Sequence, residues 1–374
     1  MIISKIYKAG ILPFFLILLL SLFSPPGDSQ ILQDTSTINL IKKGMRHIYN
    51  MEFDSAKNVL SEIGKLYPRH PVIYLYRGLL NYWENFPLIP ESPARKSYEE
   101  DMNRTISMCE SDTSQVSTTE NLLANLCARG LLLLFYADNG MSKDVIPLAT
   151  STYKYLRQSF DFTARCADFY YFTGLYNYYR EAYPRMHPVY KIIAFMFPAG
   201  DAEKGLKELE IAADTSIVLK AESYSMLSWI WLHFENNYQK SLLYCKILHD
   251  LYPGNVLFSS MYVKNLMLLR QYNESERIVN LTQHDKNAYY QAQLLIFKGI
   301  LQEKKYHNYA LAQEYYEKGI NDLSEFDVYG NEYAAYGYFG LSRICDIYND
   351  NHGRRVNRRK AMDLTDFKKI NFDN

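Results

Sequence analysis

The stretch that decides the fold runs from Thr37 to Pro68 and reads TINLIKKGMRHIYNMEFDSAKNVLSEIGKLYP. Apolar residues recur in it every three or four positions, which is the period of an amphipathic α-helix. Gly44, Ala56 and Pro68 stand twelve residues apart. Two small residues let two helices approach closely where they cross, and a proline cannot continue the second helix. The stretch therefore predicts a pair of helices and the start of a new unit.

A similar pattern recurs between Ala221 and Pro253. Ser241 takes the small position of the second helix, and the proline follows it by twelve residues. The match is partial, because Trp229 stands where the first helix should carry a small residue. Almost every segment after Gln33 has the helical period, and no alternating apolar and polar run is followed by a hairpin turn. We therefore expect an all-α fold.

Three weaker helical pairs are predicted at residues 255–281, 289–323 and 332–367. In the second of them Gly299 and Ala312 are thirteen residues apart, which implies a one-residue insertion. The last pair has a basic second helix, and we expect it to form the polar cap that a repeat array needs.

Residues 71–215 are less regular. Asn85 to Pro93 (NFPLIPESP) is a proline-rich interruption, and Gly78 and Gly174 stand where the first helix of a pair would carry a small residue. The segment 166–214 is rich in tyrosine and broken by prolines. We expect the protein to differ from a plain array there.

The spacing of Gly44, Ala56 and Pro68 resembles that of the tetratricopeptide repeat, which has a period of about 34 residues. The resemblance is close over residues 37–68 and moderate over 221–367. It implies an α–α superhelix, a solenoid of antiparallel helix pairs whose first helices line a concave face. Exported proteins of this kind are commonly scaffolds for other proteins or ligand-binding partners of envelope transport systems.

A second resemblance rests on Gly200-Asp201-Ala202-Glu203-Lys204-Gly205-Leu206, with Gly174-Leu175 upstream. These residues are similar to a divergent tetratricopeptide family that includes inclusion-body-clearance and outer-mitochondrial-membrane proteins of eukaryotes and their bacterial relatives. This resemblance covers less than a third of the chain and implies no catalytic residue.

Residues 1–29 are predicted to be a signal peptide, and residues 30–374 the helical repeat domain. Lys5 and Lys8 precede the apolar run from Ile11 to Phe23, which is shorter than the roughly 20 residues of a membrane-spanning helix. We therefore expect an exported protein that is periplasmic, secreted or envelope-associated. An uncleaved anchor is the alternative, because the expected cleavage site near Ser29 is not a clean Ala-x-Ala.

The charge balance argues against a nucleic-acid partner. Lys and Arg total 41, as do Asp and Glu, whereas proteins that bind nucleic acid or anionic lipid usually carry a basic surplus. The one basic cluster, at 354–360, is predicted to be a solvated helix face. The five cysteines are odd in number and far apart, which favours buried free thiols.

The motifs of catalysis are absent from the sequence. It contains no phosphate-binding glycine loop, no His-Glu-x-x-His and no Gly-x-Ser-x-Gly. His233 and His249 fall on neighbouring predicted helices, and we interpret them as surface or seam residues. We predict no enzymatic activity, no cofactor and no metal.

The leading hypothesis is a scaffold that binds a protein or peptide partner in the concave groove. The alternative is a sugar or a lipidic ligand in an aromatic pocket built from Tyr170 to Tyr183, Trp229 and Trp231, since the chain has 34 tyrosines. The candidate groove residues are first-helix positions that point away from the packing stripe: Tyr74, Arg77, Asn81, Tyr171, Asn177 and Arg180.

Overall fold

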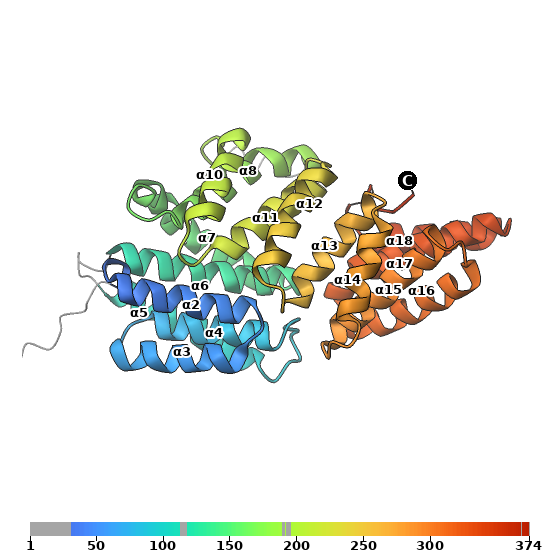
Figure 1. Ribbon diagram of the computed structural model, residues 1–374. Helices are drawn as coiled ribbons and strands as arrows, with labels where there is room; N and C mark the ends of the chain where they lie inside the picture. The colour runs from blue at the N-terminus through green and yellow to red at the C-terminus, as the bar shows by residue number, and fades with distance from the viewer. Residues whose placement is uncertain (1–30, 113–117, 189–190, 192–195, 368, 374) are drawn as a thin grey trace, which may run out of the picture.

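The computed structural model describes residues 31–112, 118–188, 191, 196–367 and 369–373. Within these residues the chain forms sixteen α-helices and no β-strand, and neighbouring helices pack in consecutive pairs (Figure 1). The expected all-α superhelix is confirmed. The pairs are α2 (Thr35–Tyr49) with α3 (Phe53–Leu66), α4 (Val72–Glu84) with α5 (Arg95–Ser111), α6 (Thr118–Asp138) with α7 (Ser142–Ser159), α8 (Phe169–Met186) with α10 (Ala202–Thr215), α11 (Lys220–His233) with α12 (Tyr238–Leu251), α13 (Val256–Leu268) with α14 (Tyr272–Thr282), α15 (Ala288–Lys304) with α16 (Tyr309–Leu323), and α17 (Val328–Ile347) with α18 (Asn351–Leu364).

Six of these pairs share one turn between their two helices. In each, the residue two positions before the second helix has a positive φ, in the left-handed region. In the first pair the amide of Glu52, which follows such a residue, donates to the carbonyl of His47 five positions back, as in a Schellman motif. The six left-handed residues are Met51, Gly140, Asn236, Arg270, His307 and Asn349.

The other two pairs, α4 with α5 and α8 with α10, have longer connections. The α6–α7 pair lies inside the region expected to be irregular, yet it has the common turn. The departures from a plain array are therefore confined to two connections: the proline-rich loop after α4, and residues 187–201, of which 189–190 and 192–195 lie outside the described residues.

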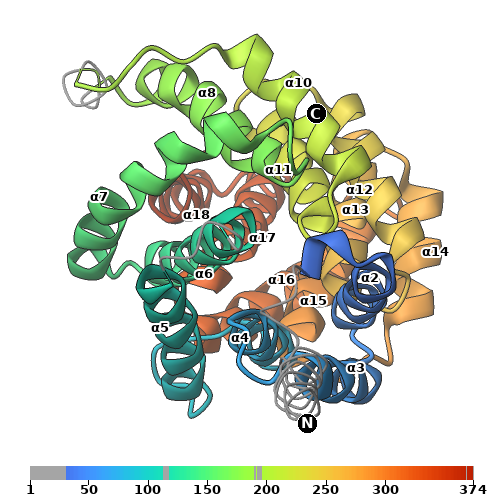
Figure 2. The same cartoon turned by 90° about the vertical axis from the view of Figure 1, so that its left-hand side faces the viewer.

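The first helix of a pair is more deeply buried than the second. Twelve of the thirteen residues of α13 are buried, against three of the eleven in α14. Eleven of the twenty residues of α17 are buried, against one of fourteen in α18. In Figure 2, which looks along the superhelix, α6 and α11 lie nearer its centre than their partners α7 and α12. The first helices therefore form the inner face of the superhelix.

The superhelix closes on itself after about one turn, so that the first pair meets the junction between α12 and α13 (Figure 2). The side chain of Asn255 donates to the carbonyl of Tyr49 at 2.9 Å, and the amide of Gly254 donates to the Asn50 side chain at 2.8 Å. Asn287 donates to the carbonyl of Phe86 at 3.2 Å. These bonds join residues about 200 positions apart and fix the diameter of the turn.

Aromatic side chains fill the closure. Trp83 lies 5.5 Å from Tyr49 and 5.6 Å from Phe258, measured between ring centroids. Phe86, in the proline-rich loop, lies 6.1 Å from Tyr289 and 5.7 Å from Tyr329. The loop that interrupts the repeat pattern therefore carries the ring that meets the C-terminal pairs.

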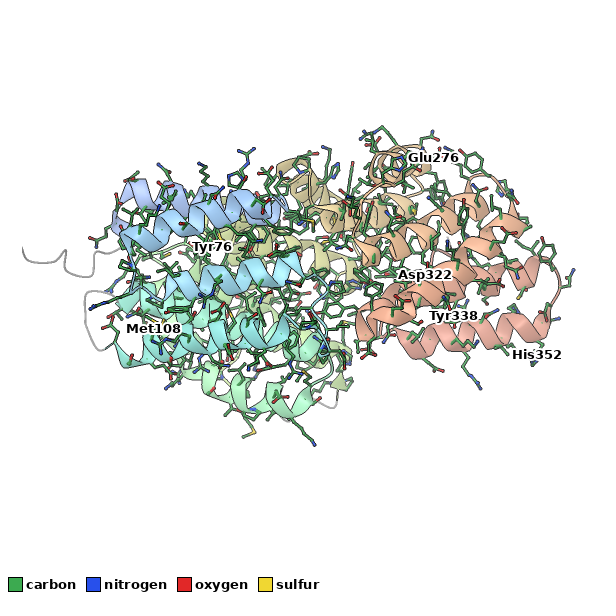
Figure 3. All side chains as sticks on the ribbon, turned by 90° about the horizontal axis from the view of Figure 1, so that it is seen from below. Tyr76, Met108, Glu276, Asp322, Tyr338 and His352 are labelled. Carbon is green, nitrogen blue, oxygen red and sulfur yellow. The ribbon has the colours of Figure 1, made fainter. Side chains whose placement is uncertain are left out.

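Gly44, the small residue of the first helix, lies at a different contact from the one expected. A Cβ added at Gly44 would overlap the ring and hydroxyl of Tyr76, which belongs to the next pair (Figure 3). Gly44 therefore makes room for the neighbouring pair and not for α3. In the α11–α12 pair, the residue that meets Ser241 is Ser228 and not Trp229, with 3.0 Å between the two hydroxyl oxygens.

The predicted signal peptide lies outside the described residues. In the part of the chain that the structure describes, no helix combines the length and the apolar character needed to cross a bilayer. All five cysteines are free thiols, and four of them are buried.

Candidate binding site on the inner face

The three candidate groove residues on α4 face α5, their own second helix. Arg77 forms a bidentate ion pair with the buried Asp101 of α5, and its guanidinium also lies over the ring of Tyr74, 5.1 Å from the centroid. Asn81 donates to the carbonyl of Ala94 at 3.1 Å. Their polar groups are therefore engaged in holding α4 against α5.

The three candidates on α8 are engaged within their own pair or in the core. Asn177 is buried and donates to Glu208 of α10 at 2.8 Å. Arg180 donates to the carbonyl of Phe197 at 3.1 Å. Tyr171 packs among core residues, and burial raises its pKa. The six candidates thus form two separate sets, each facing its own pair, and their role in binding stays a prediction.

The residues of the expected aromatic pocket do not lie together on one surface. Tyr178 and Tyr179 lie in the core beside Phe234. Trp231 is covered by the ammonium group of Lys240, 3.8 Å from its ring centroid. Trp229, on the same helix, packs instead against His233 and Phe367 and is 36% exposed. The structure brings only Trp229 to the polar cluster described next.

That cluster joins His233 of α11, Lys264 of α13 and Glu332 of α17, which are the first helices of three pairs. The Nζ of Lys264 lies 3.0 Å from Oε1 of Glu332, and Nε2 of His233 lies 3.6 Å from the same oxygen. The side chains of His233 and Lys264 are 0% and 5% exposed, whereas that of Glu332 is 25% exposed. Glu332 is therefore the member of the cluster that solvent reaches.

The imidazole of His233 lies between two aromatic rings. Its centroid is 3.8 Å from that of Trp229 and 4.1 Å from that of Phe367. Neither ring nitrogen has a hydrogen-bond partner among the described residues. A buried polar group without a partner costs stability, on the order of 1–3 kcal/mol, so its position needs an explanation.

The environment fixes the charges of the cluster. Burial lowers the pKa of His233 to about 3, against the opposing effect of Glu332, so the imidazole is neutral near pH 7. Burial alone would raise the pKa of Glu332, but the positive charge of Lys264 and the hydrogen bond from Tyr336 lower it. At neutral pH the cluster therefore holds an ion pair beside a neutral imidazole that offers one donor and one acceptor.

Further polar side chains lie next to the ion pair. The hydroxyl of Ser260 donates to Gln293 at 2.6 Å and lies 2.9 Å from the hydroxyl of Tyr333. The ammonium of Lys264 lies 5.6 Å from the centroid of the Tyr333 ring. Four consecutive first helices, α11, α13, α15 and α17, therefore contribute to one patch, which we name the inner-face cluster: Trp229, His233, Ser260, Lys264, Gln293, Glu332, Tyr333 and Tyr336.

A polar hollow of about 330 Å³ lies elsewhere, between α5, α6 and α7, and Asn121, Asn125 and Tyr155 are among its lining residues. Asp112 and Thr118, the last and first described residues on either side of 113–117, also line it. Within the described part of the chain, no three His, Cys, Asp or Glu side chains are grouped so as to hold a metal ion.

Sequence reasoning missed most of the inner-face cluster. His233 was interpreted as a surface or seam residue together with His249, whose Nδ1 lies 3.0 Å from the hydroxyl of Ser259. The available signal was Lys264, the single charged residue in the largely apolar stretch VLFSSMYVKNLML. A charged residue on a buried helix needs a partner, and sequence spacing does not show that Glu332, 68 positions away, supplies it.

A scan of the chain against models of protein families gives no match. No curated protein matches its sequence.

Proposed function

We propose that the protein is an exported, non-enzymatic scaffold of the tetratricopeptide kind, which binds a protein or peptide segment on its inner face. The observation that carries the proposal is the inner-face cluster. Four first helices place side chains in one patch, and His233 is left there with two unused ring nitrogens. Repeat proteins bind through such composite surfaces on their concave side.

The chemistry of the cluster favours a peptide. An ion pair, a neutral imidazole and amide and hydroxyl groups match the alternating donors and acceptors of an extended backbone. Trp229, at the exposed edge of the cluster, offers a flat surface for an apolar or aromatic side chain.

The test is a selection from a displayed library of random peptides, with the mature chain of residues 30–374 as bait. We expect selected peptides to lose at least tenfold in affinity in Trp229→Ala and Lys264→Met. Trp231→Ala is the matched control, because that ring lies on the same helix against Lys240, away from the cluster. Peptides whose affinity is the same in all three variants would contradict the proposed site.

A small ligand is the second candidate function, and the exposed Trp229 ring beside the unbonded His233 favours it. Thermal melting of the mature chain with sugars and with lipid-like compounds separates the two candidates. A shift in melting temperature that Trp229→Ala abolishes, together with a peptide selection that yields no binder, would favour the small ligand.

A further inference from the structure

The chain continues beyond its last helix and lies on the inner face. We name the residues 365–367 and 369–373 the C-terminal strap. Figure 1 shows the C-terminus above α18, away from the outer end of the last pair. Ile370 and Phe372 of the strap are 1% and 5% exposed, although neither belongs to a helix. These two apolar side chains of the strap are therefore as deeply buried as those of the core.

The two phenylalanines of the strap contact different helices. Phe372 lies 5.1 Å from the ring of Tyr336 on α17, edge to face. Phe367 lies 5.5 Å from Trp229 and 4.1 Å from His233, both on α11. The strap therefore bridges α17 and α11, which belong to the eighth and fifth pairs, and it covers the inner-face cluster.

Polar contacts hold the end of the strap. Nη1 of Arg343 donates to the carbonyl of Asn371 at 2.5 Å and lies 3.2 Å from the carboxylate of Asp373. The guanidinium of Arg358 lies 3.3 Å from the same carboxylate. These contacts use a backbone carbonyl and an acidic side chain, which a separate peptide of suitable sequence can also supply.

A segment that served only as a cap for the last pair would need to cover no helices other than α17 and α18. The strap reaches three pairs further back, and the ring it places there is the one that encloses His233. Phe367 is also only partly buried, unlike the ring of Phe372. The contact with α11 is thus the part of the strap that a competitor can reach.

We infer that the C-terminal strap occupies the partner's binding surface. The partner supplies a segment of the same chemistry: an aromatic residue, an aliphatic residue three positions later, a second aromatic residue two positions after that, and an acidic residue next to it. The pattern is that of Phe367, Ile370, Phe372 and Asp373. This inference rests on the proposed function, and it adds the partner's chemistry and a built-in competitor.

Because the strap belongs to the same chain as the surface, the strength of its competition with a free peptide can be estimated. A linked segment has an effective concentration on the order of millimolar, so a free peptide of the same sequence competes poorly with it. Loosening the strap should expose the surface and raise the affinity for a free peptide. The probe is a labelled synthetic peptide of residues 364–374, and the protein is the mature chain with Phe367→Ala and Phe372→Ala together.

We expect the double variant to bind the peptide at least tenfold more tightly than the unaltered chain does. Tyr348→Ala, which removes a 59% exposed ring at the residue that follows α17, is the matched control and should leave the weak binding unchanged. The same peptide with both phenylalanines replaced by alanine should not bind. Equal affinities in the double variant and the unaltered chain would overturn the inference.

A second measurement uses the unaltered chain, in case the double variant does not fold. The peptide carries a photoreactive benzophenone in place of Phe367 and is present at millimolar concentration. Cross-links are expected on α11, near Trp229, and links confined to the outer helices would overturn the inference. If library peptides bind the inner face but the strap peptide does not, the inference fails and the proposed function stands. If neither binds, both fail.

Discussion

Two ion-paired carboxylates on neighbouring first helices have very different surroundings. Glu303 of α15 is 4% exposed, and Arg343 donates to its two oxygens at 2.6 and 2.9 Å, while the hydroxyl of Tyr316 donates at 2.7 Å. Glu332 of α17 is 25% exposed and pairs with Lys264. Beside it lies His233, whose ring nitrogens have no hydrogen-bond partner among the described residues.

The comparison shows that burial of a charge does not by itself mark a binding site. Burial would raise the pKa of Glu303, but Arg343 and Tyr316 outweigh it and lower the pKa, so this group is ionised and fully paired. Such a saturated network fixes α15 against α17. In the inner-face cluster, by contrast, the ring nitrogens of His233 have no hydrogen-bond partner among the described residues, and Trp229 and Phe367 pack against the imidazole.

The largest effect is expected from breaking the saturated network with Arg343→Met. The substitution leaves Glu303 buried with only the more distant ammonium of Lys304, 3.5 Å away, as a cation, and removing one partner of a buried pair costs about 3–5 kcal/mol. The free energy of unfolding, from urea denaturation followed by circular dichroism, measures it. Arg358→Met is the control, because it removes only a guanidinium group on a side chain that is 51% exposed. A cost below about 1 kcal/mol for Arg343→Met would contradict the assigned role.

A smaller effect is expected from Lys264→Met in the inner-face cluster. Glu332 loses its cation but keeps the hydrogen bond from Tyr336 and partial access to water, so the cost should be about 2 kcal/mol. The charge of Lys264 also lowers the pKa of His233, so that pKa should rise in the variant. Titration of the imidazole C–H signals by NMR measures the rise, with Lys246→Met, in an exposed pair on α12, as the control.

The next effect is a loss of stability in acid. Because the folded-state pKa of His233 is about 3 and the ordinary value is 6.5, the unfolded chain binds a proton between these values that the folded chain does not. The free energy of unfolding therefore falls as the pH falls below 6.5, by up to about 1.4 kcal/mol per pH unit from this group. His233→Phe keeps a ring between Trp229 and Phe367 and removes the titration.

The measurement compares the unfolding free energies of the two proteins between pH 6.5 and 5, above the range in which Glu332 titrates. The stability of His233→Phe should fall less steeply over this range. Glu222 acts in the opposite direction, since burial raises its pKa to about 8, but it is present in both proteins and cancels in the difference. Parallel pH profiles would show that His233 is not held neutral.

The sequence was sufficient for the fold class because apolar periodicity is local. Gly44, Ala56 and Pro68 correctly predicted the first pair, although Gly44 accommodates Tyr76 of the next pair. The common turn was missed for a physical reason. Left-handed positions favour glycine and asparagine, yet this chain places Met51, Arg270 and His307 at three of them, so composition gave no signal.

The candidate groove residues show where sequence reasoning stops. A helical period tells which side chains share a face, but it does not tell whether that face meets the second helix or the interior. Arg77 and Asn177 both meet their second helix. The inner-face cluster depends on closure of the superhelix and on the path of the strap, and no local pattern specifies either.

The smallest effect is expected at the outer edge of the saturated network. Asp373→Asn removes the carboxylate that Arg343 and Arg358 share, at 32% exposure, while the carbonyl of Asn371 still accepts from Arg343. An exposed ion pair contributes about 0.2–1 kcal/mol and is screened by salt, so the cost should be below 1 kcal/mol and should shrink in 1 M NaCl. Chemical denaturation with urea at two salt concentrations measures it. A larger, salt-independent loss would mean that Asp373 belongs to the buried network with Glu303. The saturated network would then include the end of the strap.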